Sequence, residues 1–182
     1  DILASPDLVF RHLELHQRRP EMRIAGLGLT RWNESDQTVT EFMRWLDESG
    51  LQFAYGDLLR GERPNWKHFY TSNLSLKTRL LQTNPFDESF SRYGMEDLEL
   101  GYRLEQKYGL EVAFLPAAAA GHLHPTDFRR TCERVNRQPR TQEIGEIVRR
   151  RMGDVGSCDN VHRPACSTSL CARCDNCHAI QL

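Results

Sequence analysis

Alternating strand-like and helix-like segments predict an α/β protein. Segments with the two-residue alternation of strands are separated by segments whose apolar residues recur every three or four positions, as on one face of a helix. The chain has 182 residues, of which 39% are hydrophobic and 27% charged. This length and composition fit one folded domain with a tail, and they exclude a fibrous or wholly disordered chain.

The first half of the chain is predicted to form a helix, a strand and a second helix. Ser5 and Pro6 begin the first helix, since Ser5 can accept a backbone N–H and Pro6 fits the first helical position, where no donor is needed. Residues 22–29 alternate like a short strand, and residues 38–48 carry the apolar face of an amphipathic helix. Glycines and a proline break any period in residues 51–66, which we expect to be a loop.

The second half continues the alternation of strands and helices. The predicted strands are residues 68–76, 110–115 and 117–123, and the predicted helices are residues 77–83, 96–108 and 126–151. Prolines and a glycine set several of these limits, because proline cannot continue a helix or donate to a sheet and glycine favours the left-handed helix end. The residues concerned are Asn84-Pro85 after one helix, Gly109 at the end of the next, Pro116 between two strands and Pro139 within the last helix.

Charge divides the chain into three parts. Acidic residues outnumber basic ones in residues 1–125, basic residues outnumber acidic ones in residues 126–152, and residues 153–182 are nearly neutral. The net charge of −1 offers no field that attracts nucleic acid, so we expect no nucleic-acid partner. No run of about 20 apolar residues is present, so no membrane-spanning segment is expected. The basic helical extension at 126–152 could lie on an anionic membrane surface or pack on another domain.

Two adjacent carboxylates, Glu96 and Asp97, open the predicted helix at residues 96–108. The first turn of a helix favours anions, because its N–H groups lack partners and the helix dipole is positive there. The pair could therefore serve only to cap the helix. Gly94 favours a turn that exposes the carboxylates at the edge of a cleft, where one of them can face a substrate.

A longer pattern surrounds this carboxylate pair. It consists of Asn73-Leu74-Ser75, a helix, Phe86-Asp87-Glu88-Ser89-Phe90, Gly94-Met95-Glu96-Asp97-Leu98-Glu99-Leu100 with Arg103, a strand, Pro116 and His122. In order and spacing, residues 68–124 resemble family-2 glycosyltransferases of the GT-A fold. The resemblance implies that residues 1–125 are the C-terminal portion of a GT-A-like domain, a Rossmann-related mixed sheet flanked by helices.

The first residues resemble a second motif of the same family. Asp1-Ile2, followed by Ser5-Pro6-Asp7, is similar to the end of an Asp-x-Asp metal-binding motif and the helix start after it. We therefore expect a fragment that begins within this motif and lacks the N-terminal nucleotide-binding half. Such a fragment is expected to be inactive or nearly so, because the missing half holds the donor in line for attack.

The resemblance also implies a reaction and its residues. The family transfers a sugar from a nucleotide-sugar donor to an acceptor hydroxyl, and direct displacement inverts the anomeric centre. Asp97 matches the general base, and Glu96 matches the neighbour that positions the acceptor or the loop. Asp1 and His122, with His124 as second choice, match the ligands of a divalent metal, Mn²⁺ or Mg²⁺, that bridges the donor diphosphate.

Four more residues are assigned to substrate binding by their place in or beside the pattern: Asn73, Ser72, Trp66 and Arg103. Structural roles are the alternative, since tryptophans are more often core residues than sugar platforms and the two histidines could simply end a strand. Thr71-Ser72 stands where many relatives have small residues, and Asn84-Pro85 replaces their Gly-Gly. These departures leave open how closely the loop approaches the substrate.

Five of the six cysteines lie in residues 153–182. Cys171, Cys174, Cys177 and His178 could bind Zn²⁺ and so let a short segment fold without a core. The cysteine spacing matches no complete zinc signature and makes a poor disulfide framework. The alternative is a disordered or spurious extension.

Together these features predict a hexosyl-type, inverting, metal-dependent glycosyltransferase, of which this chain is the acceptor-side portion. Its expected partners are a nucleotide-sugar donor and a glycan, lipid-linked or protein acceptor. Its expected location is the cytoplasm, and contact with the inner face of the membrane is left open. Two alternatives stay open: a non-catalytic glycan-binding module and a metal-binding module carried by the cysteine tail.

Overall fold

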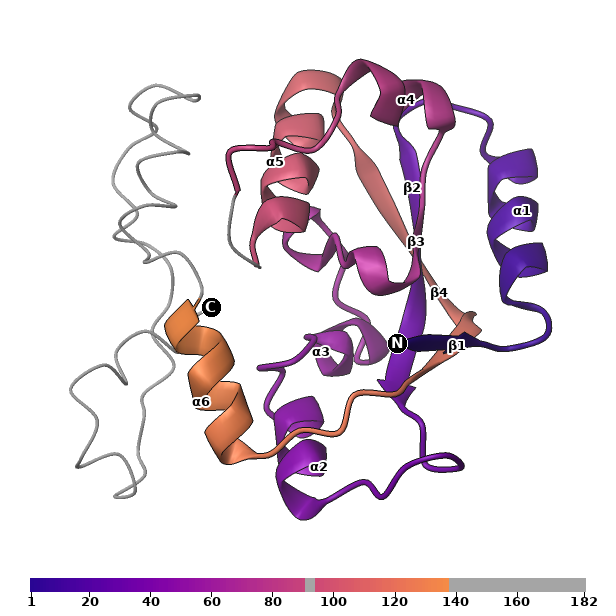
Figure 1. Ribbon diagram of the computed structural model, residues 1–182. Coiled ribbons are helices and arrows are strands. Elements are labelled where there is room, and N and C mark those ends of the chain that lie inside the picture. The colour runs from indigo at the N-terminus through magenta and orange to yellow at the C-terminus, as the bar shows by residue number, and fades with distance from the viewer. Residues whose placement is uncertain (91–93, 138–182) are drawn as a thin grey trace.

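A four-stranded mixed sheet forms the centre of the protein and confirms the α/β class. The computed structural model describes residues 1–90 and 94–137. In the order of the sheet, the strands are β1 (Ile2–Ala4), β4 (Glu111–His122), β2 (Ile24–Trp32) and β3 (Leu74–Ser75). The long strands β2 and β4 are parallel, and the short edge strands are antiparallel to their neighbours (Figure 1).

Helices pack against the sheet and around its end. They are α1 (Leu8–Arg18), α2 (Glu41–Glu48), α3 (Tyr55–Leu59), α4 (Thr78–Thr83), α5 (Glu96–Tyr108) and α6 (Phe128–Arg137), with the 3₁₀ helices η1 (Trp66–His68) and η2 (Thr71–Asn73). Figure 1 shows α1 and α5 on opposite sides of the sheet and α2 and α6 near the end of β2. The helix α1 lies directly on β2, since a Cβ added to Gly26 would be 2.8 Å from the Leu15 side chain.

The main hydrophobic core lies between the sheet and α5. Its buried members are Ala25, Leu27, Tyr55, Leu58, Phe69, Leu80, Leu100, Leu104, Leu110 and Val112. The helix α5 contributes two of these leucines and approaches η1 closely, because a Cβ added to Gly101 would be 2.6 Å from Phe69. This close packing fixes the start of α5, where the two predicted catalytic carboxylates lie, against residues 66–73.

The strand β4 differs from the sequence prediction of two strands divided by Pro116. It is one strand from Glu111 to His122, but its pairing with β2 is irregular, since Leu115 pairs with Gly28 and Ala120 with Thr30. Pro116 falls in this irregular stretch. Proline has no N–H to donate to a sheet, so it interrupts the pairing with β2 without ending the strand.

Residues 51–76 also differ from the prediction. The short helix α3 occupies part of the predicted loop, and the predicted strand at 68–76 is mostly two 3₁₀ turns, with only Leu74–Ser75 in the sheet. Asn65 explains the first turn. Its side chain accepts the Lys67 N–H, and the His68 side chain accepts the backbone N–H of Asn65, which completes a capping box. Such side-chain bonds offer the backbone an alternative to the sheet.

Helix ends agree with the prediction where a local signal sets them. The helix α5 has the predicted limits, and Gly109 ends it in the left-handed conformation with its N–H bonded to the Glu105 carbonyl. The first helix starts later than predicted, because Ser5 Oγ donates to the Asp7 side chain instead of capping the helix. The described part of the predicted helix at 126–151 is α6. None of the described helices is both long and apolar enough to cross a membrane.

Candidate active site

The predicted metal ligand His122 lies at the carboxyl end of β4, beside the end of the parallel strand β2. Trp32 and His122 are the last residues of β2 and β4 and pair in register. Asp1 joins them from the other side of β4, since the Leu123 N–H donates to the Asp1 carbonyl at 2.8 Å. Crevices at the carboxyl ends of parallel strands are the usual binding sites of open α/β sheets. The backbone of Asp1 thus lies beside the end of β4, and the joint role of Asp1, His122 and His124 stays a prediction.

His122 lies within a stack of parallel rings. Its ring centroid is 5.1 Å from that of Trp32 and 5.4 Å from that of His124, with interplanar angles of 5° and 9°. Burial, together with the nearby His124 and Arg134, lowers the pKa of His122 to about 4. The His122 imidazole is therefore neutral near pH 7, and neutral imidazole is the form that binds metals. Its Nδ1 is buried and has no hydrogen-bond partner within the described residues.

Gln37, which the sequence analysis did not single out, holds this histidine segment in place. Its side-chain Nε2 donates to the His122 carbonyl, and its Oε1 accepts the His124 N–H at 3.1 Å. The Asn33 N–H donates to the same His122 carbonyl. Residues 33–37 thus take over the bonding to β4 where β2 ends. No local pattern marks Gln37, because its partners lie 85 and 87 residues away.

The residues around His122 can supply part of a metal site. One carboxylate and two imidazoles suit Mn²⁺, and the carboxylate also suits Mg²⁺. Within residues 1–90 and 94–137, no three His, Cys, Asp or Glu side chains come close enough together to hold an ion on their own. The chemistry of these side chains suits a divalent ion, and metal binding stays a prediction.

Asp97 lies in the first turn of α5, after a turn with unusual backbone angles. Gly94 and Met95 have φ values of 114° and 75°, and Met95 is the one non-glycine residue with positive φ in the described parts of the chain. The Glu96 carboxylate accepts the Gly94 N–H at 2.9 Å and so closes this turn. Asp97 accepts the Leu98 N–H at 2.8 Å and also lies near the Thr71 N–H.

The two carboxylates differ in their environment. Burial raises the pKa of the Asp97 carboxyl above its usual range, and the neighbouring charge of Glu96 adds to the rise. A carboxylate with a raised pKa is a stronger base, and one that stays ionised near neutral pH can take a proton from a hydroxyl. Glu96 is engaged by the backbone of the turn, so the geometry favours Asp97 as the base and Glu96 as its support.

An aromatic floor connects Asp97 with His122. Tyr70 lies close enough to Asp97 for the carboxylate to raise the pKa of Tyr70, a minor addition to the effect of burial. The Tyr70 and Phe53 ring centroids are 5.0 Å apart, and those of Phe53 and His122 are 6.1 Å apart. Tyr55 packs against both Phe53 and Tyr70. These rings are continuous with the hydrophobic core, to which Tyr55 belongs and against which Phe53 and Tyr70 pack.

Three buried hydroxyl groups lie next to this floor. Thr30 Oγ1, Tyr55 Oη and Ser72 Oγ have no hydrogen-bond partner within the described residues. Burial raises the pKa of Tyr55 to about 12, although the nearby Thr30 and Ser72 oppose the rise. Buried hydroxyls usually have partners, in protein or in bound water. The hydroxyls of Thr30, Tyr55 and Ser72, the last a predicted substrate-binding residue, thus lie close to one another beneath the candidate site.

Asn73, also predicted to bind substrate, is buried and fully bonded. Its Nδ2 donates to the carbonyls of Leu29 and Ala118 at 3.3 and 2.9 Å, and its Oδ1 lies 2.9 Å from His12 Nε2. Since Oδ1 can only accept, His12 donates this bond from Nε2. Asn73 thus occupies the irregular stretch between β2 and β4 and supplies donors to carbonyls there.

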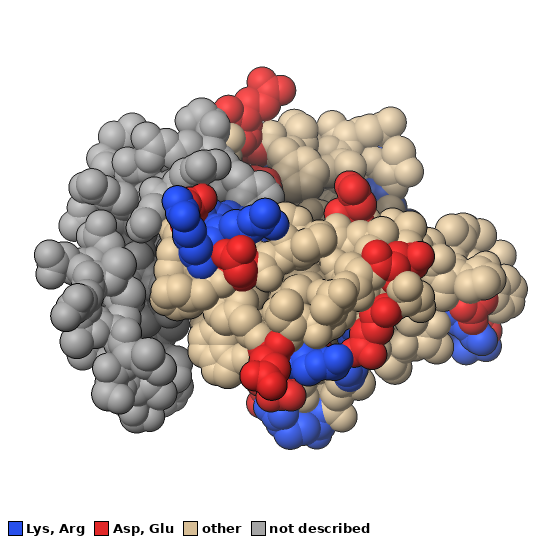
Figure 2. All heavy atoms as spheres, turned by 60° about the horizontal axis from the view of Figure 1, so that its bottom comes forward, with Lys and Arg blue, Asp and Glu red and all other residues tan. Residues whose placement is uncertain are grey.

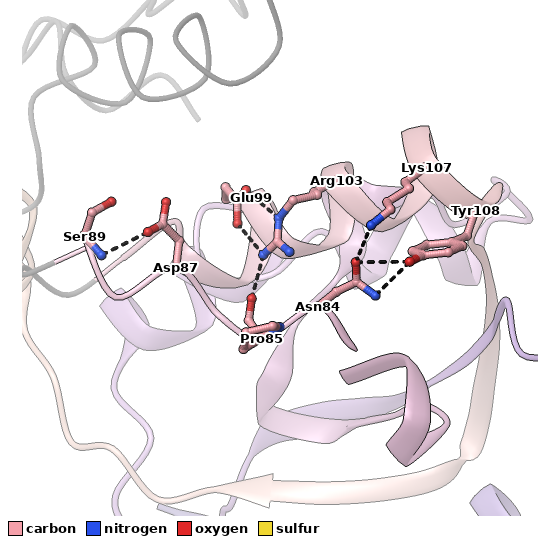
Figure 3. A network of polar contacts seen from close by, with 8 residues as sticks. All are labelled: Asn84, Pro85, Asp87, Ser89, Glu99, Arg103, Lys107 and Tyr108. Atoms are coloured by element: carbon pink, nitrogen blue, oxygen red, sulfur yellow. Dashed lines mark hydrogen bonds and ion pairs between the residues drawn. The ribbon is translucent and has the colours of Figure 1, made fainter. Parts of the chain in front are cut away.

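Arg103 lies in a polar network on the outer side of α5 (Figure 3). It forms two bonds with the buried carboxylate of Glu99, at 2.9 and 3.1 Å, and a third with the Pro85 carbonyl at 2.8 Å. Asn84, in the same figure, bonds with Lys107 and Tyr108 of α5. These bonds tie residues 84–85 to the helix that carries Asp97.

Trp66 and the cysteine tail complete the predicted set. Trp66 is half-buried, and its ring meets that of Tyr102 edge to face at 5.1 Å, so it packs η1 against α5. Cys171, Cys174, Cys177 and His178 lie outside the described residues. On the face of the molecule drawn in Figure 2, basic side chains lie beside acidic ones and form no continuous basic patch.

Comparison with known proteins finds relatives named as glycosyltransferases. The uncharacterized glycosyltransferase YfnE of Bacillus subtilis (strain 168) is 45% identical over 148 residues, a match that covers 58% of this chain and 38% of the relative. Validoxylamine A glucosyltransferases of Streptomyces hygroscopicus subsp. jinggangensis (strain 5008) and subsp. limoneus are each 36% identical over 98 residues, which cover 51% of this chain and 21% and 19% of theirs. No protein-family model matches the chain.

These relatives confirm the predicted similarity to glycosyltransferases, a class of enzymes that transfer sugars. The chain spans well under half the length of the curated relatives that it matches. Family 2, the GT-A fold, inversion and metal dependence stay predictions.

Proposed function

We propose that this chain is the acceptor-side part of an inverting, metal-dependent glycosyltransferase of family 2 with a GT-A fold. The observation that carries the proposal is the half-buried Asp97 carboxylate, whose pKa burial raises, at one end of an aromatic floor that leads to His122. The relatives named as glycosyltransferases support the same class of reaction. The donor is a nucleotide sugar, of hexosyl type, and the acceptor is a glycan, a lipid-linked sugar or a protein.

In the proposed reaction Asp97 accepts the proton of the acceptor hydroxyl. The acceptor oxygen forms a bond to the anomeric carbon as the bond from that carbon to the donor phosphate breaks on the opposite side, which inverts the anomeric centre. The nucleoside diphosphate leaves with the bonding electron pair. Glu96 holds the turn at Gly94 through its 2.9 Å bond, so that Asp97 faces the acceptor.

Asp1 and His122, with His124 as second choice, would hold Mn²⁺ or Mg²⁺ at the ends of β1 and β4. The ion would stabilise the negative charge of the leaving diphosphate. Gln37 and Asn33 keep the His122 backbone in place, and stacking on Trp32 orients the His122 ring. These contacts prepare the imidazole for a ligand and limit its movement.

The remaining predicted residues either contact the acceptor or position other groups. Ser72 and Trp66, which are both half-buried, contact the acceptor. Asn73 and Arg103 act as positioning residues, because their polar atoms are bonded to the backbone of Ala118 and Pro85 and to Glu99. The acceptor can also be a molecule at the inner face of the cytoplasmic membrane.

The test uses the full-length protein that contains this chain. Purified enzyme is incubated with a panel of nucleotide-sugar donors and acceptors, and sugar transfer is measured for the wild type, for Asp97→Asn and for Asp57→Asn. Asp57 lies on α3 and pairs with Arg60 at the surface, so it controls for loss of one carboxylate. We expect transfer that falls at least about 100-fold in Asp97→Asn, the low end of the usual contribution of a general base, and stays unchanged in Asp57→Asn. Near-normal transfer by Asp97→Asn would reject Asp97 as the base.

A further inference from the structure

A cluster of polar side chains joins the helix α1 to the segment that ends in β3. His12 of α1 is buried, and its ring nitrogens Nδ1 and Nε2 lie 2.7 Å from Ser75 Oγ and 2.9 Å from Asn73 Oδ1. His16, one helical turn later, has its Nε2 2.9 Å from the same Ser75 Oγ. The proposed reaction uses neither histidine, so these bonds need another explanation.

The partners of Asn73 fix the direction of every hydrogen bond in this cluster. Its Nδ2 donates to two backbone carbonyls, so its Oδ1 faces His12 and accepts from Nε2. In a neutral imidazole the other nitrogen, Nδ1, is then an acceptor, and the Ser75 hydroxyl donates to it. The Ser75 oxygen in turn accepts from His16 Nε2. One chain of donors thus runs from His16 through Ser75 and His12 to Asn73.

The charges near the cluster favour neutral imidazoles. The bonds of the His12 ring go to a hydroxyl and an amide, and neither carries a negative charge that would stabilise an imidazolium. The Lys77 ammonium donates to the His16 carbonyl at 3.1 Å and places a positive charge beside the cluster. Burial, together with Lys77 and His12, lowers the pKa of His16. The chain therefore keeps its direction near neutral pH.

The opposite end of the same segment contacts the proposed base. Asn73 is the last residue of η2, and Thr71 is the first. The Thr71 N–H lies near the Asp97 carboxylate and lowers its pKa, against the larger effect of burial. A segment of three residues therefore connects the anchor on α1 to Asp97.

Several groups act on the charge of Asp97. The neighbouring carboxylate of Glu96 adds to the rise in the pKa of Asp97, and Tyr70, whose own pKa burial raises, faces it from the residue before η2. The N–H groups of Leu98, Thr71 and Asp97 itself oppose the rise. Of these three, Leu98 and Asp97 belong to α5, whereas the contact from Thr71 depends on where η2 lies. The position of η2 therefore controls one stabilising contact of the ionised base.

We propose that His12 is a positioning residue that acts on Asp97 through η2. Its bond to Asn73 anchors one end of η2, and the Thr71 N–H at the other end then meets the carboxylate. The Ser75 hydroxyl keeps the hydrogen of His12 on Nε2, where the bond to Asn73 needs it. The inference rests on the proposed function, which makes Asp97 the base.

The pKa of Asp97 in the full-length protein tests this inference. It is measured from the acidic limb of kcat/KM for sugar transfer against pH, and from the carboxyl carbon resonance that disappears in Asp97→Asn. His12→Asn is too short to reach Asn73, so the Thr71 N–H is no longer held against the carboxylate. We expect the pKa of Asp97 to rise by about 1 unit in His12→Asn, the usual effect of losing one hydrogen bond to a charged group. An unchanged pKa of Asp97 in this variant overturns the inference.

Two variants separate the hydrogen bond from the packing of α1. His12→Gln brings an amide N–H to the place of Nε2, so the pKa of Asp97 should stay near that of the wild type. Leu15→Ala is the matched control, since Leu15 packs on Gly26 from the same helix and belongs to no bond of the cluster. We expect Leu15→Ala to lower the melting temperature and leave the pKa of Asp97 unchanged. An equal rise in Leu15→Ala and His12→Asn would contradict the proposed role of the bond.

The outcomes also distinguish the inference from the proposed function. If the enzyme transfers sugar and the pKa of Asp97 does not move in His12→Asn, the inference fails while the proposed function stands. If no donor is used and the carboxyl resonance titrates at higher pH in His12→Asn, the anchor stands and the proposed function fails. Nitrogen NMR of the wild type, labelled in histidine, gives a test that needs no folded variant. We expect the hydrogen of His12 on Nε2, and a hydrogen on Nδ1 alone would overturn the inference.

Discussion

Burial moves the pKa values of Asp97 and His122 in opposite directions, but it favours the neutral form of each. The carboxyl of Asp97 has a raised pKa, and the imidazole of His122 has a pKa of about 4. For Asp97 the cost of ionisation makes the carboxylate a better proton acceptor. For His122 the same effect keeps a lone pair free at neutral pH. Burial of each residue thus costs folding stability when the residue is charged, and the same burial tunes its protonation for the proposed chemistry.

The cost of ionising Asp97 can be measured in the variant Asp97→Asn. A carboxyl whose pKa is higher in the folded than in the unfolded state stabilises the fold below its usual pKa and loses this contribution as the pH rises through the folded value. At pH 7 the ionised Asp97 is therefore unfavourable. We expect Asp97→Asn to melt at a higher temperature than the wild type at pH 7 while it loses transfer activity. A lower melting temperature at pH 7 would show that the carboxylate is well paired.

His122 should make the stability of the protein depend on pH below neutrality. Its pKa is about 4 in the folded state and near 6.5 in the unfolded state, so the unfolded state binds more protons between these values. Stability should therefore fall as the pH is lowered from about 6.5 to about 4. We expect His122→Gln to flatten this part of a plot of melting temperature against pH. Burial also lowers the pKa of His68, so His68→Gln is the matched variant in the same experiment. If His122→Gln leaves the slope unchanged, His122 is not the group that titrates.

At the scale of single elements, the irregular pairing of β4 with β2 is the feature that organises the others. Between the pairs Leu115–Gly28 and Ala120–Thr30, β4 has more residues than β2, and the side chain of Asn73 reaches into this stretch. A Cβ added to Gly28 would be 2.3 Å from Asn73 Nδ2. Gly28, the irregular pairing and Asn73 therefore depend on one another. Together they set the direction of β4 toward its last residue, His122.

Replacing Asn73 tests this dependence. In Asn73→Ala the carbonyls of Leu29 and Ala118 and the His12 ring each lose a buried partner. We expect the free energy of unfolding to fall by about 3 kcal/mol, the sum of several unsatisfied groups. Asn65→Ala, which removes an exposed cap of η1, should cost only about 1 kcal/mol in the same denaturant titration. Equal effects of the two substitutions would argue that Asn73 has no special place in the sheet.

The elements that the sequence could predict are those with local signals. The limits of α5 follow from the carboxylates at its start and from Gly109 at its end, and both signals lie within the helix or next to it. The strand β4 could not be predicted as one element, because its continuity depends on pairing with residues about 90 positions earlier. The 3₁₀ turn η1 depends on the side-chain cap of Asn65, which competes with strand formation.

At the scale of the whole molecule, the candidate site joins both ends of the described chain. Asp1 and His122 are adjacent in space because β1 pairs with β4, with Ile2 opposite His122. The motif-based resemblance predicts a shared role for these two residues, which stays a prediction. Gln37 could not be found in this way, because no spacing or motif links it to the histidines. Folding alone brings its side chain to residues 122–124.

Metal removal tests the site at this scale. We expect transfer by the full-length protein to be lost after treatment with EDTA and restored by Mn²⁺. The same result should be obtained with a variant truncated before Gly153, which lacks the cysteine tail. Turnover that survives EDTA would reject the metal. Stoichiometric zinc in the full-length protein that disappears on truncation, with transfer unchanged, would show that the tail binds a separate ion.

The contacts of Gln37 have a consequence for the solubility of the protein. Past the end of β2, the backbone of residues 122–124 would offer an N–H and a carbonyl to any extended segment that approached it. The Gln37 amide engages both groups at once, as a neighbouring strand would. The Gln37 side chain thus occupies the backbone hydrogen-bonding groups at this edge of the site. A substrate can approach this rim while the strand of another molecule finds no free pair of groups to add to.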